Sequence, residues 1–263
     1  MSNKNIIAVS SGKGGVGKTT VSVNLAVAMA QQGAKVGLMD ADIYGPNIPM
    51  MMGINDKPRQ AANGRIAPLE KYGLKIISIG FLAGENAPLI WRGPIVSKII
   101  QQFLSDVDWG DLDYLFVDMP PGTGDAQLTL TQAAALAGGV IVSTPQDVAL
   151  GDAMRGVRMF EQVKVPILGL VENMSYYLCP ECGARAEIFD HGGGRRAAEK
   201  YNVPFLGEVP LDTRIRVGGD KGVPIVVAEP DSVFAQVFHD MVKRLAANIS
   251  KYNEPLKLGK VVF

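Results

Sequence analysis

The chain has 263 residues, 47% of them hydrophobic, which is enough apolar content for one large buried core. Its formal net charge is zero, so composition gives no general reason to expect a nucleic acid or an anionic membrane as a partner. Met1–Lys4 leads directly into an apolar run too short for a signal peptide, and no later run is long enough to span a bilayer. We therefore expect a cytoplasmic protein with one domain over residues 1–263, ending in a tail over residues 250–263.

The first motif is a glycine-rich loop between an apolar strand and an apolar helix. Residues 6–9 are typical of a buried strand, and residues 21–29 of a helix that ends near Gly33. Between them, the sequence from Gly12 to Thr19 reads G-K-G-G-V-G-K-T, the pattern of a phosphate-binding loop. The sequence therefore predicts a P-loop at the start of the first helix.

Each residue type in this loop has a chemical reason. Glycine lets backbone N–H groups approach a polyphosphate without an intervening Cβ. Lys18 supplies a positive charge for the β- and γ-phosphates of ATP, and Thr19 a hydroxyl for Mg²⁺. A glycine-rich turn without a ligand is the alternative interpretation. The residues expected to bind the nucleotide here are Gly12, Lys13, Gly14, Gly15, Val16, Gly17, Lys18, Thr19 and Thr20.

Lys13 is a second lysine that the loop's own nucleotide does not require. A solvated surface lysine is one interpretation. The spacing K-G-G-V-G-K-T resembles the deviant P-loop of the MinD, ParA and nitrogenase iron-protein group, in which the first lysine reaches the partner subunit's nucleotide. This resemblance implies a two-fold homodimer with nucleotide near the interface.

Two carboxylates, Asp40 and Asp42, follow the expected strand over residues 35–39. They lie at the carboxyl edge of a parallel sheet, where ligands bind. Near a magnesium nucleotide, one carboxylate can hold a metal-bound water while the other orients the attacking water. Acidic turn residues are the alternative. The loop over residues 42–49, rich in Gly and Pro, follows directly.

The middle of the chain adds a second nucleotide signature. Residues 53–73 are polar and interrupted by Gly and Pro, so we expect an irregular excursion with a small hairpin. A strand over 74–80 and a helix from Trp91 to Phe103 follow. The next strand, 114–118, ends in Asp118, which we expect to bind Mg²⁺ through water, and its Gly-rich loop can sense a γ-phosphate.

Asn173 is a candidate for contact with the adenine base. It follows an expected strand over residues 167–172, itself preceded by a strand over 139–144 and a helix over 149–163. Its amide offers a donor and an acceptor side by side, which matches the N6/N7 edge of adenine. An ordinary turn residue is the alternative.

Cys179 and Cys182 are the only cysteines, and their spacing is C-x-x-C. Two cysteines do not build a disulfide framework in so long a chain, so the pair indicates metal or redox chemistry. Zn²⁺ or a [4Fe-4S] cluster is usually held by four protein ligands, so two must come from elsewhere. His191 with Glu181 or Asp190 would complete a local zinc site, a redox disulfide is a further alternative, and a two-fold dimer would supply four thiolates.

The last elements complete the expected fold. Helices are predicted over residues 195–201 and 232–249, with a strand over 204–209 between them. Pro210 begins the turn after that strand, and we place it beside the nucleotide. Strands alternating with helices predict a three-layer α/β fold, with a mostly parallel sheet covered by helices on both faces, as in P-loop NTPases.

The chain as a whole resembles the Mrp/ApbC group of P-loop ATPases, which carry iron-sulfur clusters. The matching segments are Gly12–Thr20, Asp40–Pro49, Trp91–Pro94, Asp118–Asp125, Glu172–Ser175 and Cys179–Cys182. Many members of that group have an extra N-terminal domain or cysteine cluster, and we expect neither here. The resemblance implies an ATP-hydrolysing homodimer that transfers a cluster from an assembly scaffold to apo iron-sulfur proteins.

The resemblance also implies individual roles. Lys13 would act across the dimer, Lys18 and Thr19 on phosphate and Mg²⁺, and Asp42 beside the hydrolytic water. Asp118 would hold a water of the metal, and Asn173 would contact adenine. Cys179 and Cys182 of two subunits would bridge one [4Fe-4S] cluster, with Zn²⁺ as the alternative metal in isolated protein.

Two other functions compete with this interpretation. A positioning ATPase of the MinD/ParA kind would need a basic amphipathic membrane helix or a basic DNA-binding stripe. Pro255 and Gly259 interrupt the C-terminal segment, and the net charge does not favour DNA, so we expect no membrane and no nucleic-acid partner. A nucleotide switch with a structural zinc site is the second alternative.

Overall fold

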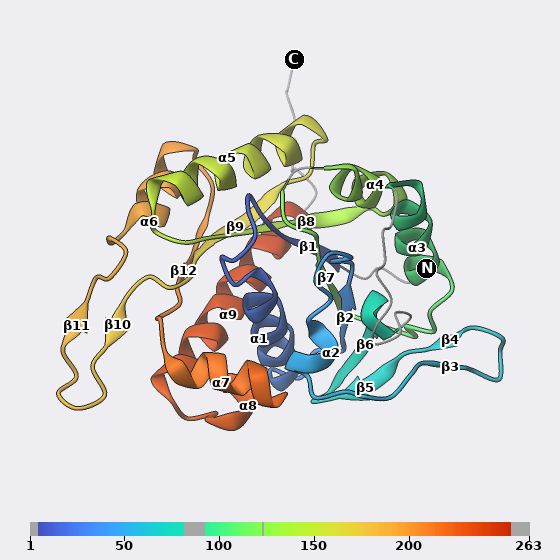
Figure 1. Cartoon of the computed structure of the whole chain (residues 1–263). Coiled ribbons are helices and arrows are strands. Elements are labelled where there is room, and N and C mark those ends of the chain that lie inside the picture. The colour runs from blue at the N-terminus through green and yellow to red at the C-terminus, as the bar shows by residue number, and fades with distance from the viewer. Residues whose placement is uncertain (1–4, 82–92, 123, 254–263) are drawn as a thin grey trace, which may run out of the picture.

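The computed structural model describes residues 5–81, 93–122 and 124–253. Its centre is an eight-stranded sheet (Figure 1). Every neighbouring pair of strands is parallel except the pair at one edge. In spatial order the strands are β12 (Phe205–Glu208), β9 (Ile167–Glu172), β8 (Leu136–Ser143), β1 (Asn5–Ser11), β7 (Tyr114–Asp118), β2 (Val36–Asp40), β6 (Leu74–Ser78) and β5 (Leu69–Lys71).

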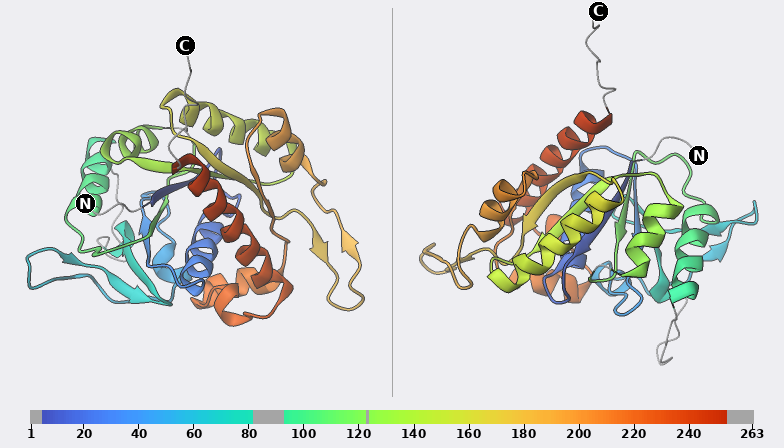
Figure 2. Two further views of the ribbon diagram at one scale, coloured as in Figure 1. Left: turned by 180° about the vertical axis from the view of Figure 1, so that it is seen from behind. Right: turned by 90° about the horizontal axis from the view of Figure 1, so that it is seen from above.

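Helices cover both faces of this sheet, which confirms the predicted three-layer, mostly parallel α/β architecture (Figures 1 and 2). On one side lie α3 (Gly93–Ser105), α4 (Asp125–Ala133), α5 (Asp147–Gln162) and α6 (Gly193–Lys200). On the other lie α1 (Lys18–Gln31), α7 (Thr213–Lys221), α8 (Ile225–Ala228) and α9 (Val233–Asn253), with the short helices α2 (Ile48–Met51) and η1 (Ile79–Phe81) nearby.

Helix α1 is buried along most of its length between the sheet and α9. It begins directly after Gly17, whose φ is 79°, and has neither a side-chain cap nor an acidic residue in its first turn. The N–H groups of a helix's first turn have no partner within the helix. The start of α1 therefore presents backbone donors and the positive end of the helix dipole to the P-loop.

Several elements were not predicted. Strand β5 pairs antiparallel with β6 at the edge of the sheet, and helices α4, α7 and α8 are short segments without a long apolar period. Strand β8 begins at Leu136, three residues earlier than expected. Glycine is a poor strand former, so Gly138 gave no strand signal, yet it pairs with β1. Long apolar runs were thus easier to identify than short polar elements.

Two hairpins project from opposite sides of the body (Figure 1). The first, formed by β3 (Arg59–Gln60) and β4 (Ile66–Ala67), confirms the small hairpin expected within residues 53–73. The second, formed by β10 (Tyr177–Leu178) and β11 (Arg185–Ala186), carries the C-x-x-C turn. Trp91, Arg92, Thr123 and residues 254–263 lie outside the described residues. The tail was expected to begin at residue 250, but residues 250–253 continue α9 instead. Among the described helices, none combines the length and hydrophobicity required to cross a membrane.

The backbones of Gly53 and Gly222 touch where α2 meets α7. A Cβ on Gly222 would lie 2.3 Å from the Cα of Gly53, closer than a real Cβ contact. The phenol of Tyr72 donates to the Gly222 carbonyl at 2.9 Å, and Lys71 Nζ donates to the Gly53 carbonyl at 2.8 Å. This contact fixes α2, which follows the Asp42 loop, against the helix that follows β12.

The glycine contact gives a stability prediction. Gly222 has a φ of 72°, so Gly222→Ala adds left-handed strain, about 1–2 kcal/mol, and overlap with Gly53 that costs about 1–3 kcal/mol more. Gly33→Ala is the matched control, because Gly33 has a φ of 90° and open space at its Cβ position. Urea unfolding should show a clearly larger loss of free energy for Gly222→Ala. Equal losses for the two variants would mean that the contact contributes nothing to stability.

Candidate functional site

Three carboxylates converge on the lysine at the start of α1. The register pairs Asp40 of β2 with Asp118 of β7, so the ends of these strands place both carboxyl groups next to the P-loop. Lys18 Nζ lies 2.7 Å from Asp118 Oδ2 and 3.4 Å from Asp42 Oδ2, with only 6% of the lysine side chain exposed. Burial alone lowers the pKa of Lys18, but Asp118 and Asp42 outweigh it and raise that pKa above its usual value.

Asp118 accepts hydrogen bonds from three residues of α1. Besides Lys18, the hydroxyl of Thr19 donates to Oδ2 at 2.7 Å and that of Ser22 to Oδ1 at 2.6 Å. The predicted residues Lys18, Thr19 and Asp118 are therefore brought together. Ser22 was not predicted, although its position one turn after Lys18 was a usable signal.

Asp40 and Asp42 have different surroundings. Asp40 is fully buried and accepts from Ser78 Oγ at 2.8 Å and from the backbone N–H groups of Ile48 and Asp42, so it holds the loop between β2 and α2 in place. Burial raises the pKa of Asp40 to about 8, and the nearby Asp118 adds to the effect. Burial also raises the pKa of Asp42, opposed by Lys18. Only Asp42 faces the cavity described next.

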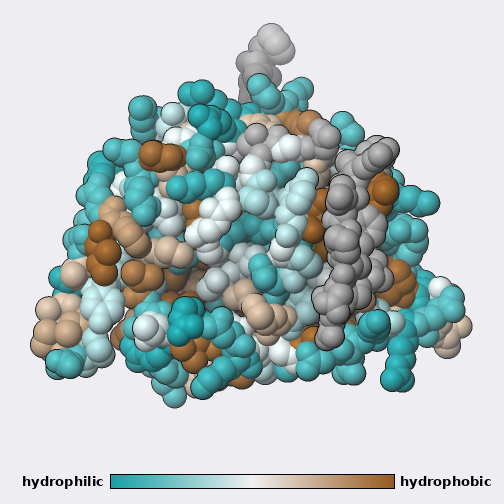
Figure 3. All heavy atoms as spheres, in the orientation of Figure 1, coloured by the Kyte–Doolittle hydropathy of each residue, from teal (hydrophilic) through white to brown (hydrophobic). Residues whose placement is uncertain are grey.

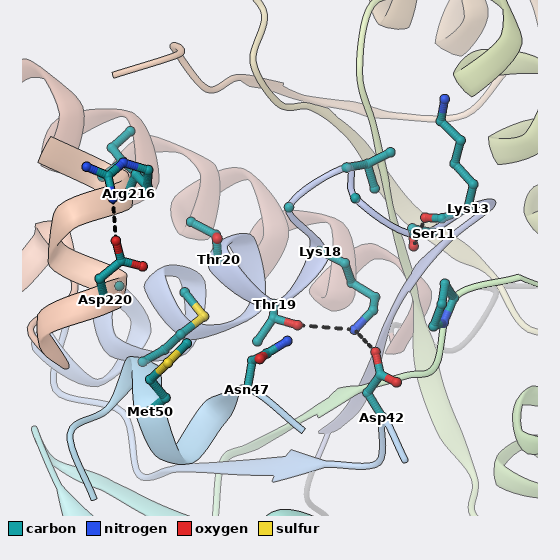
Figure 4. A pocket seen from close by; sticks show the side chains of 18 residues that line it. Ser11, Lys13, Lys18, Thr19, Thr20, Asp42, Asn47, Met50, Arg216 and Asp220 are labelled. Atoms are coloured by element: carbon teal, nitrogen blue, oxygen red, sulfur yellow. Dashed lines mark hydrogen bonds and ion pairs between the residues drawn. The ribbon is translucent and has the colours of Figure 1, made fainter. Parts of the chain in front are cut away.

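A cavity of about 360 Å³ lies over the P-loop (Figure 4). The loop, the start of α1 and Pro121 form one wall, and α2 and α7 form the other. Helix α7 was not predicted, so its contribution was missed. The residues outside the loop and α1 that line the cavity are Ser11, Asp42, Asn47, Met50, Met51, Pro121, Ile215, Arg216, Gly219 and Asp220.

The P-loop glycines have distinct roles in this geometry. Gly14 and Gly15 have open space around them, as expected for a loop whose backbone must approach a ligand. A Cβ on Gly12 would overlap the backbone of Asp152 in α5, and one on Gly17 would overlap the Asn173 amide. Two of the four glycines therefore allow close packing behind the loop as well.

Lys13 lines the cavity mouth, but its side chain extends away from Lys18 (Figure 4). Its carbonyl accepts from Ser11 Oγ at 2.9 Å, which fixes the loop. Within the described residues, the Lys13 ammonium forms no ion pair. Its charge is thus directed outward, away from the phosphates that its own loop would hold.

Asn173 and Pro210 lie behind the cavity rather than on its lining. Asn173 Nδ2 donates to the Val16 carbonyl at 2.8 Å, so this side chain supports the P-loop directly. This bond uses one of the two N–H donors of the amide, and contact with adenine stays a prediction. Pro210 is buried after β12, where the flanking Val209 and Leu211 bond to the segment around Asn173.

Cys179 and Cys182 occupy a tight turn at the end of the β10–β11 hairpin. The N–H of Cys179 donates to the Ala184 carbonyl at 2.9 Å, and that of Gly183 to the Cys179 carbonyl at 2.8 Å. Backbone N–H groups of Cys182 and Glu181 stabilise the thiolate of Cys179 and lower the pKa of its thiol. Hydrogen bonds to sulfur are a common feature of metal–thiolate sites.

The structure does not bring His191 to the cysteines. Its Nδ1 lies 2.9 Å from Arg185 Nη2, at the base of the hairpin. Across the described residues, the metal-ligand atoms that gather in a group of three or more are those of Glu172, His191 and Glu208, without either cysteine. A local zinc site made by the cysteine pair with His191 is therefore not formed in this geometry.

The P-loop, the Lys18–Asp118 cluster and the parallel sheet define a P-loop NTPase. The family model for NUBPL iron-transfer P-loop NTPases of the ParA group matches residues 2–246, and the chain belongs to this family. It is 56% identical over 252 residues to a Synechocystis iron-sulfur cluster carrier protein, covering 94% of this chain and 71% of that protein. An Escherichia coli iron-sulfur cluster carrier protein is 51% identical over 261 residues, covering 99% and 70%.

Solved structures agree with this assignment. A nucleotide-binding protein from Archaeoglobus fulgidus in complex with ADP is similar with a TM-score of 0.76 and 41% identity, covering 89% of this chain and 91% of that one. The cell-division ATPase MinD from Pyrococcus furiosus has a TM-score of 0.70 at 24% identity, covering 93% and 99%. At that identity the second likeness concerns the fold alone.

The buried Asp40 gives a prediction for pH dependence. Its folded pKa of about 8 lies above the unfolded value of roughly 3.9, so its contribution to stability is present below about pH 4 and is lost as pH rises to about 8. Asp40→Asn removes this titration. Between pH 5 and pH 8, the free energy of unfolding measured in urea should fall by about 1 kcal/mol or more in the parent relative to the variant. If the difference in unfolding free energy between parent and variant stays constant with pH, the raised pKa of Asp40 is contradicted.

Proposed function

We propose that the cavity binds Mg-ATP and that the protein hydrolyses it. Supporting this, the P-loop offers free backbone donors at the start of α1, and Lys18 and Thr19 face Asp118. Phosphate would compete with Asp118 for the Lys18 ammonium, and Mg²⁺ would be held by Thr19 with Asp118. Asp42, on the cavity wall, would orient the attacking water.

We also propose that the active unit is a two-fold dimer in which Lys13 acts on the partner's nucleotide. The outward direction of its side chain supports this role (Figure 4). Large apolar side chains are exposed beside the nucleotide cavity, among them Tyr44 at 80% and Met50 at 54%. The surface on this side is otherwise largely polar, with separate hydrophobic residues between polar ones (Figure 3). An interface over this site would cover Tyr44 and Met50.

The cargo in this proposal is an iron-sulfur cluster bound by Cys179 and Cys182. The observation that carries it is the exposed C-x-x-C turn, whose backbone stabilises a thiolate, in a chain related to iron-sulfur cluster carriers. Two copies would supply four thiolates for one [4Fe-4S] cluster. The cluster would pass from an assembly scaffold to apo iron-sulfur proteins, since the exposed turn leaves it accessible.

Lys13→Ala should separate nucleotide binding from hydrolysis. Because its ammonium points away from its own loop, the variant should retain most of the parent's ATP affinity but hydrolyse ATP more slowly. Lys18→Ala is the contrasting variant, since losing a charge-assisted contact of about 1.5–3 kcal/mol weakens binding about ten- to a hundredfold. Isothermal titration and phosphate release would measure both. Parent-like turnover in Lys13→Ala would rule out action across a dimer.

Cys179→Ser and Cys182→Ser test the cargo. Anaerobic reconstitution of the parent should give a brown dimer with about four irons, as expected for one cluster shared by two cysteine pairs. Either serine variant should lose iron and colour while still binding ATP. Iron content, visible absorbance and size-exclusion mass are the measurements. Stoichiometric zinc in each monomer, with no iron uptake, would contradict the carrier function and support a zinc-stabilised nucleotide switch.

A further inference from the structure

The hairpin that carries the cysteines needs support from outside itself. Strands β10 and β11 have two residues each and pair through Tyr177 with Ala186 and Leu178 with Arg185. Residues 180–191 are all exposed. So short a ladder is not stable alone in water. The direction in which the hairpin projects must therefore be set by side chains at its base.

Arg185 makes the contacts that join the hairpin to the body. Its guanidinium lies 3.9 Å from the centre of the Tyr176 ring. Its Nη2 is 3.4 Å from Glu208 Oε2, at the end of β12, and 2.9 Å from His191 Nδ1. Its Nε donates to Glu187 Oε1 at 2.9 Å. One side chain on β11 thus reaches the central sheet, the segment before β10 and the connection to α6.

The surface on which Arg185 stacks belongs to the rigid part of the molecule. The N–H of Leu211 donates to the Tyr176 carbonyl at 2.7 Å, and that of Ser175 to the Val209 carbonyl at 2.9 Å. Ser175 is fully buried, and its hydroxyl donates to Glu172 at the end of β9. The contact between Arg185 and Tyr176 therefore ties the hairpin to the end of the sheet.

A bound metal ion is the alternative to Arg185 as the cation at the base of the hairpin, because ligand atoms of Glu172, His191 and Glu208 lie within 4.8 Å of one another. These groups already have partners. Glu172 accepts from Ser175 Oγ and from the N–H of Gly194, and Glu208 faces the guanidinium groups of Arg185 and Arg195. A divalent ion would have to displace them, so the geometry favours arginine as the cation here.

We propose that Arg185 is a positioning residue that fixes the direction of the hairpin so that Cys179 and Cys182 of two copies meet at one cluster. The inference rests on the proposed cluster function. Four thiolates from two chains bind one cluster only if each hairpin is held in a fixed direction toward the other copy. Arg185 pairs with Leu178, which directly precedes Cys179. Contacts that hold Arg185 in place therefore also restrict the position of Cys179.

The test compares Arg185→Ala and Arg185→Lys with a matched control, Arg158→Ala. Arg158 is also an exposed arginine over a tyrosine, 5.9 Å from the ring of Tyr201, but it lies on α5. One measurement is amide hydrogen exchange of residues 177–186 in metal-free protein. The other is the rate at which an iron chelator removes the cluster from the reconstituted full chain. ATP affinity serves as the check on folding.

Arg185→Ala should exchange faster at the Cys179 and Gly183 amides and lose its cluster about tenfold faster than the parent, with unchanged ATP affinity. Lysine keeps the charge but not the planar fork, so Arg185→Lys should recover only part of the difference. Arg158→Ala should match the parent in both measurements.

Three results would overturn the inference. They are parent-like exchange in Arg185→Ala, parent-like cluster loss in that variant, and an equal effect in Arg158→Ala. Full recovery in Arg185→Lys would show that charge alone suffices and that the stacked geometry does not position the turn. If the parent itself takes up no cluster, the proposed function fails, and the exchange data then decide separately whether Arg185 anchors the hairpin.

Discussion

The ion pair between Lys18 and Asp118 is the interaction on which the nucleotide end of the molecule depends. Both groups are buried, and the carboxylate of Asp42 lies 3.4 Å from the same ammonium. A buried charge is tolerated only when it is paired and hydrogen-bonded. The site therefore holds the Lys18 ammonium between carboxylates, with the Thr19 hydroxyl bonded to Asp118 beside it. A magnesium nucleotide would have to rearrange these contacts.

The same edge of the sheet joins the Lys18–Asp118 ion pair to the cysteine hairpin. Asn173 supports the P-loop through the Val16 carbonyl, and only five residues separate it from Cys179. The residues between them are bonded to the turn after β12 through Val209 and Leu211. The P-loop and the base of the hairpin are therefore joined by a short stretch of hydrogen-bonded chain.

The parts of the fold with a local signal could be predicted from sequence. Apolar runs identified the parallel strands, and the motif placed Lys18 and Thr19 at a helix start with Asp118 opposite. The polar, glycine-containing helix α7 gave no comparable signal, so its wall of the cavity was missed. The Asn173 bond to Val16 joins residues 157 positions apart, and no local pattern encodes such a contact. The cluster-binding role of the cysteines stays a prediction.

Both edge strands of the central sheet are short. At one edge β5 has three residues, and at the other β12 has four, with the Leu206 carbonyl accepting from Arg244 Nη1 at 2.6 Å. An unpaired strand edge is a template for adding another chain. Covering that carbonyl with an arginine of α9 discourages sheet-to-sheet polymerisation. Strand addition, the route by which sheets grow into fibres, is thereby disfavoured at this edge.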